Sequence, residues 1–126
     1  MYIRFVINEH HPESNQKTGI FHAVRYMRDD GELTEEEFNI ADELMGWFSD
    51  NMKSPIEYLN KQKSKKSEVY ISWFKDSARE HIKKARELSE VIKNKNVSIE
   101  FLRTRKPGKI VYEEEEQIFA KPFERH

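Results

Sequence analysis

Apolar and polar residues alternate at the N-terminal end of the chain. Between Tyr2 and Ile7, every second residue from Ile3 onward is large and apolar. A period of two is typical of a strand that buries one of its faces. We therefore predict a first strand over these residues.

Two segments with helical spacing follow. The first opens at Gly19 and ends at Asp30-Gly31, because glycine readily takes the left-handed conformation that closes a helix. The second begins at Thr34, whose hydroxyl and the Glu37 carboxylate can each cap a free backbone amide, and it should end near Asn51. The apolar positions of the second helix are Phe38, Ile40, Ala41, Leu44, Met45, Trp47 and Phe48.

Residues 68–74 can be interpreted as a short strand or as the first turn of a third helix. An apolar stripe with helical spacing continues on both sides of a capping-box match, Ser77-x-x-Glu80. We therefore favour one helix from about Ser72 to Lys93. The stripe consists of Phe74, Ala78, Ile82, Ala85, Leu88 and Ile92.

The last quarter of the chain returns to a period of two. Ile99 and Phe101 alternate with polar residues, Pro107-Gly108 interrupts the pattern, and an apolar run resumes at Ile110. This arrangement predicts an antiparallel hairpin. A two-residue turn at Pro107-Gly108 would place Arg103 opposite Tyr112.

The order of elements predicts an α+β fold in a single domain, residues 1–126. It comprises an N-terminal strand, three helices, and a C-terminal antiparallel hairpin or meander that forms one sheet with the first strand. The first strand should pair with a C-terminal strand, which would satisfy its backbone groups. Lysine-rich residues near 60–67 are expected to form a mobile loop.

Composition narrows the class of protein. Only 37% of the residues are hydrophobic and 36% are charged, yet eight Phe, five Tyr and two Trp supply the surface for a core. Cysteine is absent, which excludes disulfides and thiolate chemistry. No signal peptide or membrane-spanning run is recognisable, so we expect a cytoplasmic protein of a bacterium, with no membrane partner.

The charge is segregated along the chain although the net charge is only −1. Asp29 to Asp50 contains nine acids and no base, whereas Lys53 to Arg86 contains ten bases and four acids. Such asymmetry can mark a surface for an anionic partner. The alternative is that acidic and basic helices pack side by side and neutralise each other.

Five residues are candidates for binding a partner or ligand. An aromatic beside a cation can stack and hold a nucleic-acid strand, although such pairs also serve as core anchors. Cations around an aromatic near a turn can hold a phosphate or carboxylate, or can simply stabilise a sheet face. The first arrangement is Trp73 with Lys75, and the second is Arg103 and Arg105 with Tyr112.

No motif identifies a catalytic residue, a cofactor or a metal site. His10 and His11 are adjacent in a loop and point in opposite directions if extended, which disfavours a shared metal. His81 lies at the edge of an apolar stripe, as boundary histidines commonly do. The four glutamates of Glu113–Glu116 cannot all face one way in a strand, so we expect a bulge or tight turn with solvated carboxylates.

Five segments of the chain bear on its family: Ile3-Arg-Phe-Val, Gly19-Ile-Phe-His-Ala, Ile71-Ser-Trp-Phe-Lys, Ala78-Arg-Glu-His-Ile and the run from Pro107 to Ala120. Together they resemble a family of small bacterial proteins with no established activity, so this resemblance implies no site. The chain also has a fainter similarity to ADP-ribosyltransferases, in which Ser72-Trp73 would match a strand start and Glu116 a catalytic glutamate. The chain departs from that pattern, since it lacks a His-Gly or Arg entry motif.

These patterns favour a non-catalytic binding or regulatory module that acts on a macromolecular partner, a protein in preference to nucleic acid. A homo-oligomer is also possible. The rival hypothesis is a small enzyme or ligand-binding protein with a pocket between the sheet and the third helix. That pocket would use Arg103, Tyr112, His81 or Glu113.

Overall fold

The structure is a computed structural model that describes residues 1–10, 17–54 and 70–123. Its described helices are α1 (Ile20–Asp29), α2 (Glu35–Asn51) and α4 (Arg79–Ile92). Its described strands are β1 (Tyr2–His10), β2 (Lys17–Gly19), β3 (Ile71–Lys75), β4 (Ile99–Thr104), β5 (Lys109–Glu113) and β6 (Gln117–Lys121). These elements confirm the predicted α+β class.

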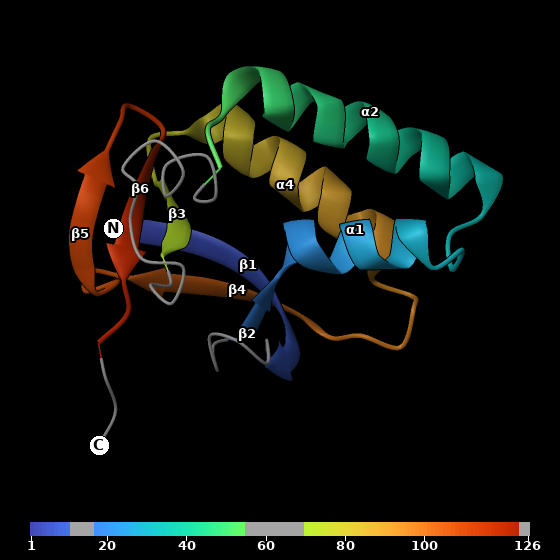
Figure 1. The fold of residues 1–126 in the computed structure, drawn as a ribbon, viewed down its shortest axis with the longest axis horizontal. Coiled ribbons are helices and arrows are strands. Elements are labelled where there is room, and N and C mark those ends of the chain that lie inside the picture. Colours follow the sequence, from blue (N-terminus) through green and yellow to red (C-terminus); the bar gives the residue numbers. More distant parts are fainter. Residues whose placement is uncertain (11–16, 55–69, 124–126) are drawn as a thin grey trace.

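Strand β1 is the centre of one antiparallel sheet (Figure 1). Strand β4 pairs with it from Tyr2 opposite Thr104 to Ile7 opposite Ile99, so the first strand does pair with a C-terminal strand, as predicted. The other side of β1 is shared by β2 and β3. Strand β3 continues the sheet to β6 and then to β5.

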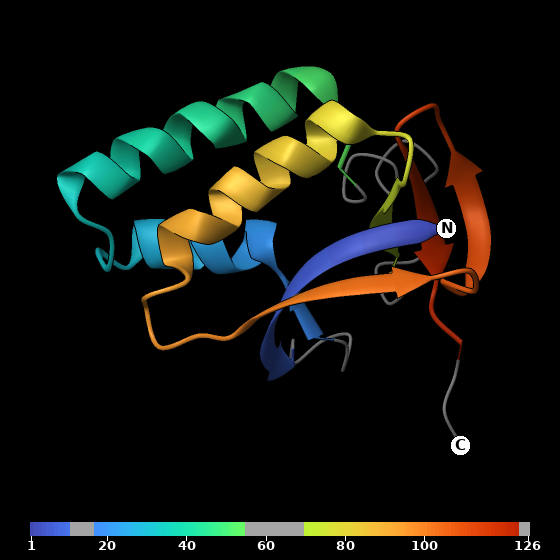
Figure 2. The ribbon, with the colours of Figure 1, turned by 180° about the vertical axis from the view of Figure 1, so that it is seen from behind.

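The three described helices lie together on one face of the sheet, and the view from behind shows the same layer (Figures 1 and 2). Ile3, Phe5 and Ile7 of β1 point toward the helices, and all three are buried. The core beneath the helices includes Ile3, Phe5, Ile7, Val24, Leu44, Phe48, Phe74, Leu88 and Ile92.

The opposite face of the sheet is also buried around its centre. Val6 follows Phe5 on β1 and therefore points away from the helices. It is 0% exposed, as are Ile118 and Ala120 of β6. Trp73 is opposite Ile118 across the β3–β6 pair and lies on this same outer face.

Local signals placed α1 and α2 correctly. Thr34 Oγ1 accepts from the Glu37 amide at 3.1 Å, and Glu37 Oε1 accepts from the Thr34 amide at 2.9 Å, which confirms the capping box. Gly31, just beyond α1, has a φ of 73°, in the left-handed region. The predicted apolar stripe of α2 was too wide, because Phe38 and Ile40 are exposed.

The prediction of one helix from Ser72 to Lys93 was wrong at its N-terminal end. Residues Ile71–Lys75 form β3, and α4 begins only at Arg79. Phe74 of β3 packs in the same core as the apolar residues of α4. Its spacing from those residues in the sequence matches that of a further helical turn, although it lies in a strand. The pairing of β3 with β1 on one side and with β6 on the other outweighs the local helical pattern there.

The predicted hairpin around Pro107-Gly108 was also wrong, although a C-terminal hairpin exists. Strand β5 pairs with β6, so Arg103 is opposite Ile3 and Tyr112 is opposite Phe119. A Cβ on Gly108 would collide with the Lys121 backbone. This close approach explains the glycine better than a hairpin turn does.

The predicted tight turn at the glutamate run is confirmed. The chain reverses between β5 and β6, and the amide of Glu114 donates to the carbonyl of Gln117 at 2.9 Å. The predicted mobile loop near 60–67 lies outside the described residues. Among the described helices, none is long and apolar enough to cross a membrane.

Candidate functional site: a basic groove between α4 and β4

A groove of about 390 Å³ lies between helix α4 and strand β4. Both elements contribute cationic side chains to its walls, and apolar side chains form the rest of its lining. The residues that line it are Ile3, Asp76, Arg79, Ile82, Lys83, Arg86, Phe101 and Arg103.

Helix α4 places its share of the groove on one side. Arg79, Lys83 and Arg86 are spaced by four and then three residues, so they follow one another along one face of the helix, with Ile82 among them. Arg79 is the first residue of α4, where the amide end of the helix dipole adds positive potential. This wall therefore carries only positive charge.

The other wall is the helix-facing side of β4. Phe101 is paired with Phe5 of β1, and Arg103 is paired with Ile3, so both side chains share the face on which the core lies. Among the described strands, β4 pairs only with β1, which makes it an edge of the sheet. Phe101 is 40% exposed because the edge is only partly covered by α4.

Two arginines lie against the ring of Phe101. The guanidinium carbon of Arg86 is 5.5 Å from the ring centroid, and that of Arg103 is 6.0 Å away. Arg86 also lies 5.8 Å from the ring of Phe5, which meets Phe101 edge to face at 5.0 Å. A guanidinium carries five N–H donors, so one that lies near a ring still has donors for a bidentate oxyanion.

The positive charge of the groove is not neutralised by the described residues. No described ion pair involves Arg79, Lys83, Arg86 or Arg103. Asp76 is the single carboxylate in the lining, and the N-terminal ammonium lies 3.6 Å from it. The groove can therefore bind a carboxylate or phosphate group by charge-assisted hydrogen bonds.

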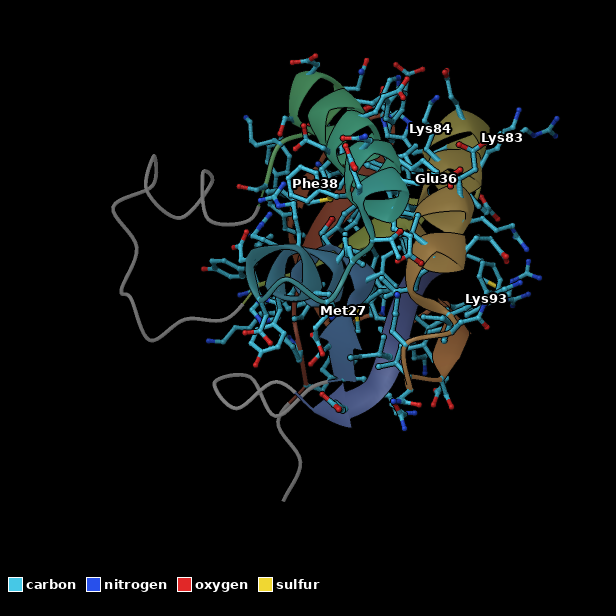
Figure 3. The ribbon with its side chains drawn as sticks, turned by 90° about the vertical axis from the view of Figure 1, so that its right-hand side faces the viewer. Met27, Glu36, Phe38, Lys83, Lys84 and Lys93 are labelled. Atoms are coloured by element: carbon cyan, nitrogen blue, oxygen red, sulfur yellow. The ribbon has the colours of Figure 1, made fainter. Side chains whose placement is uncertain are left out.

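Other cations, in α4 and just after it, contact the acidic helix α2. Lys84 lies over the ring of Trp47 at 5.3 Å, and Lys95, just beyond α4, lies 2.7 Å from Glu37. Figure 3 shows Lys84 near α2 and Lys83 pointing away from it. The two helices do pack together, as the neutralising alternative required, but the bases of the groove take no part in that neutralisation.

A polar network occupies the other end of the sheet. The side-chain amide of Gln117 donates to the Lys53 carbonyl at 2.8 Å and to the Glu114 carboxylate at 2.6 Å, and its oxygen accepts from Ser72 Oγ at 2.6 Å. Tyr112 donates to the same carboxylate at 2.7 Å. This hydrogen bond raises the pKa of Tyr112 above its usual value. The network ties β3, β5 and β6 to the end of α2.

The structure does not bring the five predicted residues together. Arg103 lies in the groove, and Arg105 is exposed beyond the end of β4. Tyr112 belongs to the network, and Lys75 is paired with Glu113 at 2.6 Å. Trp73 lies on the outer face of the sheet, where the Arg4 guanidinium carbon is 6.0 Å from its ring.

Sequence reasoning missed the α4 half of the groove. The signal was present, because Arg79, Lys83 and Arg86 repeat at helical spacing within the basic half of the chain. His81, which the rival hypothesis used, is buried against Trp47, Phe48 and Phe74, with its Nε2 3.2 Å from the carbonyl oxygen of residue 51. It is part of the core.

The chain matches no family model, no curated protein and no solved structure. The resemblance to a family of small bacterial proteins therefore stays an expectation from the sequence. Inference about function depends on the groove.

Proposed function

We propose that this protein is a non-catalytic binding module that holds an acidic segment of a protein partner in the groove between α4 and β4. The observation that carries the proposal is the pair Arg86 and Arg103, which flank one half-exposed aromatic ring without any described carboxylate partner. Arginines held in this way are preorganised, so binding a carboxylate costs little side-chain entropy.

Charge repulsion within the groove supports an anionic occupant. Arg79, Lys83, Arg86 and Arg103 line one space of about 390 Å³. All four basic residues are exposed, so their mutual repulsion acts through solvent and is strongest at low salt. An acidic partner removes that repulsion and gains direct contacts, which favours both affinity and a fast encounter.

The limited extent of the basic surface favours a protein segment over nucleic acid. Beyond the groove, toward the C-terminal end of α4, the exposed side of the helix carries Glu87 and Glu90, and Glu90 is paired with Lys93. A phosphate backbone that continued along α4 in that direction would meet these carboxylates. A short acidic peptide segment can end before it reaches them.

The second candidate function, a small enzyme or ligand-binding protein, places its pocket in the same position. A volume of about 390 Å³ suits a small ligand, which is the observation in its favour. Against it, the lining offers bases and one carboxylate but no nucleophile beside a general base. Its other named residues, Tyr112, His81 and Glu113, are absent from that lining.

The test measures binding of a short fluorescent peptide rich in Glu and Asp by anisotropy at low salt. Lys83→Ala and Arg103→Ala should each weaken binding about tenfold, which corresponds to roughly 1.4 kcal/mol. Lys93→Ala is the matched control, because it removes the same charge from a site roughly 15 Å along the helix axis from Lys83. Figure 3 labels both lysines.

Three outcomes discriminate between the hypotheses. Equal weakening by Lys93→Ala and Lys83→Ala would mean that only net charge attracts the peptide, and the groove would have no role. Tighter, groove-dependent binding of a single-stranded oligonucleotide would favour a nucleic-acid partner. Binding that persists unchanged in both groove variants would overturn the proposal.

A further inference from the structure

A break in the sheet surrounds Arg4 on β1. On one side of β1, β3 pairs with Tyr2 and Ile3, and β2 pairs with residues from Val6 onward. Arg4 therefore lies between the end of the β1–β3 pairing and the start of the β1–β2 pairing. Its side chain points to the outer face of the sheet, away from the helices and from the basic groove.

The guanidinium of Arg4 is held in this break. One terminal nitrogen donates to the Lys17 carbonyl of β2 at 2.9 Å, and the guanidinium carbon is 6.0 Å from the ring of Trp73 on β3. A Cβ at position 19 would lie 3.3 Å from the same terminal nitrogen, so Gly19 leaves the room that the guanidinium occupies. Burial lowers the pKa of Arg4 to about 10.

The indole N–H of Trp73 lies on the same face and lacks an acceptor. Its Nε1 is shielded from solvent and has no hydrogen-bond partner, the one buried side-chain nitrogen or oxygen in the described residues of which this is true. Ile3 is opposite Phe74 in the antiparallel β1–β3 pair. The next residue of β1, Arg4, therefore lies beside the preceding residue of β3, Trp73. A buried donor without an acceptor is costly.

We propose that Arg4 and the Trp73 indole together form a second anion site, on the outer face of the sheet, that takes the carboxylate or phosphate group of a small ligand. The two side chains offer only donors, and Arg4 has one described acceptor for its five N–H groups. No described carboxylate pairs with it. An oxyanion would compensate the buried charge and satisfy the indole N–H at once.

This site is independent of the proposed function. It lies on the opposite face from the groove, and none of its residues lines the groove. Burial of its donors favours a small ligand over a macromolecular segment. Separate titrations with acetate and with inorganic phosphate distinguish a site for carboxylates from a site for phosphates.

The experiment follows the indole N–H signals in a proton–nitrogen correlation spectrum of the full chain. The protein has two tryptophans, and Trp47→Phe identifies the signal of Trp73. Acetate or phosphate is added at constant ionic strength, with chloride as the reference anion. The Trp73 indole proton should shift downfield and saturate for at least one of the two oxyanions, while the Trp47 signal stays in place.

Variants test the two donors separately. Arg4→Gln should abolish the saturating shift, whereas Arg25→Gln, which removes an exposed arginine from α1, should leave it intact. Trp73→Phe keeps a ring but removes the N–H. The oxyanion should raise the melting temperature of the wild-type protein, and the same rise in the variant should need at least about tenfold more anion. This second readout holds even if Arg4→Gln does not fold.

If neither acetate nor phosphate changes the chemical shift of the Trp73 indole proton in the folded protein, the proposal is overturned. An equal, non-saturating shift of both indole signals also overturns it, because that result reports salt alone. Neither result affects the acidic-peptide assay on the groove.

Discussion

The two ends of the sheet use similar side chains in opposite ways. At the β5–β6 end, Gln117 is fully buried and its amide bonds to a serine, a backbone carbonyl and a glutamate. At the α4–β4 end, Arg86 and Arg103 lie on Phe101 and pair with no described acid. One end satisfies its polar groups internally, and the other leaves its arginines exposed and in no described ion pair.

The difference follows from which elements meet. The tight turn of glutamates brings acids next to Lys75 and Tyr112, so opposite charges and hydrogen-bonding groups are matched locally. Helix α4 and strand β4 both bring bases to the groove, and among the described residues Asp76 is the single carboxylate in its lining. A polar group with an internal partner mainly stabilises the fold, whereas one without such a partner can bind other molecules.

We expect the largest loss in the free energy of unfolding from a substitution in the aromatic core. Phe48 is 5% exposed and meets Phe21 and Trp47 edge to face. Phe48→Ala should lower the free energy of unfolding by about 3–5 kcal/mol, through lost burial and the cavity left behind. Urea denaturation measures this loss, and a value below about 1 kcal/mol would mean that the core face of α2 is misassigned.

Gln117→Leu should have the next largest effect. The leucine fills a similar volume but leaves Ser72, Glu114 and the Lys53 carbonyl without their partner, so we expect a loss of roughly 2–3 kcal/mol. Denaturation at neutral pH gives the value. If the variant is as stable as the wild-type protein, the network is dispensable and the contrast between the two ends disappears.

Groove substitutions should barely change stability. Arg103→Ala removes a contact with Phe101 and relieves repulsion from the other bases, so the free energy of unfolding should change by less than about 1 kcal/mol. The same variant should lose affinity for the acidic peptide. A loss of stability as large as that of Gln117→Leu would instead make the groove arginines structural.

The smallest effect is a titration within the network. Because its hydrogen bond to Glu114 raises the pKa of Tyr112 in the folded protein, the linked stability is fully present below a pH of about 10. It is lost as the pH rises through the folded pKa. Ultraviolet titration of tyrosinate should show that Glu114→Gln lowers this pKa, and an unchanged value would contradict the assigned hydrogen bond.

Much of the fold was predictable from local patterns, and little of the site was. The capping box at Thr34, the end of α1 at Gly31 and the first strand were all located correctly. Of the candidate residues, only Arg103 lies in the groove. The predicted contact between Arg103 and Tyr112 failed because it assumed that strands adjacent in sequence also pair.

Signals that act within one turn of helix or one tight turn are readable directly, because the interacting groups are three or four residues apart. The sequence alone therefore established the α+β class, two helices and the glutamate turn. Tertiary structure decided that Ile71–Lys75 is a strand, that β4 pairs with β1, and that Arg86 meets Arg103. Those outcomes depend on burying surfaces far apart in the chain, and such burial can override a local helical pattern.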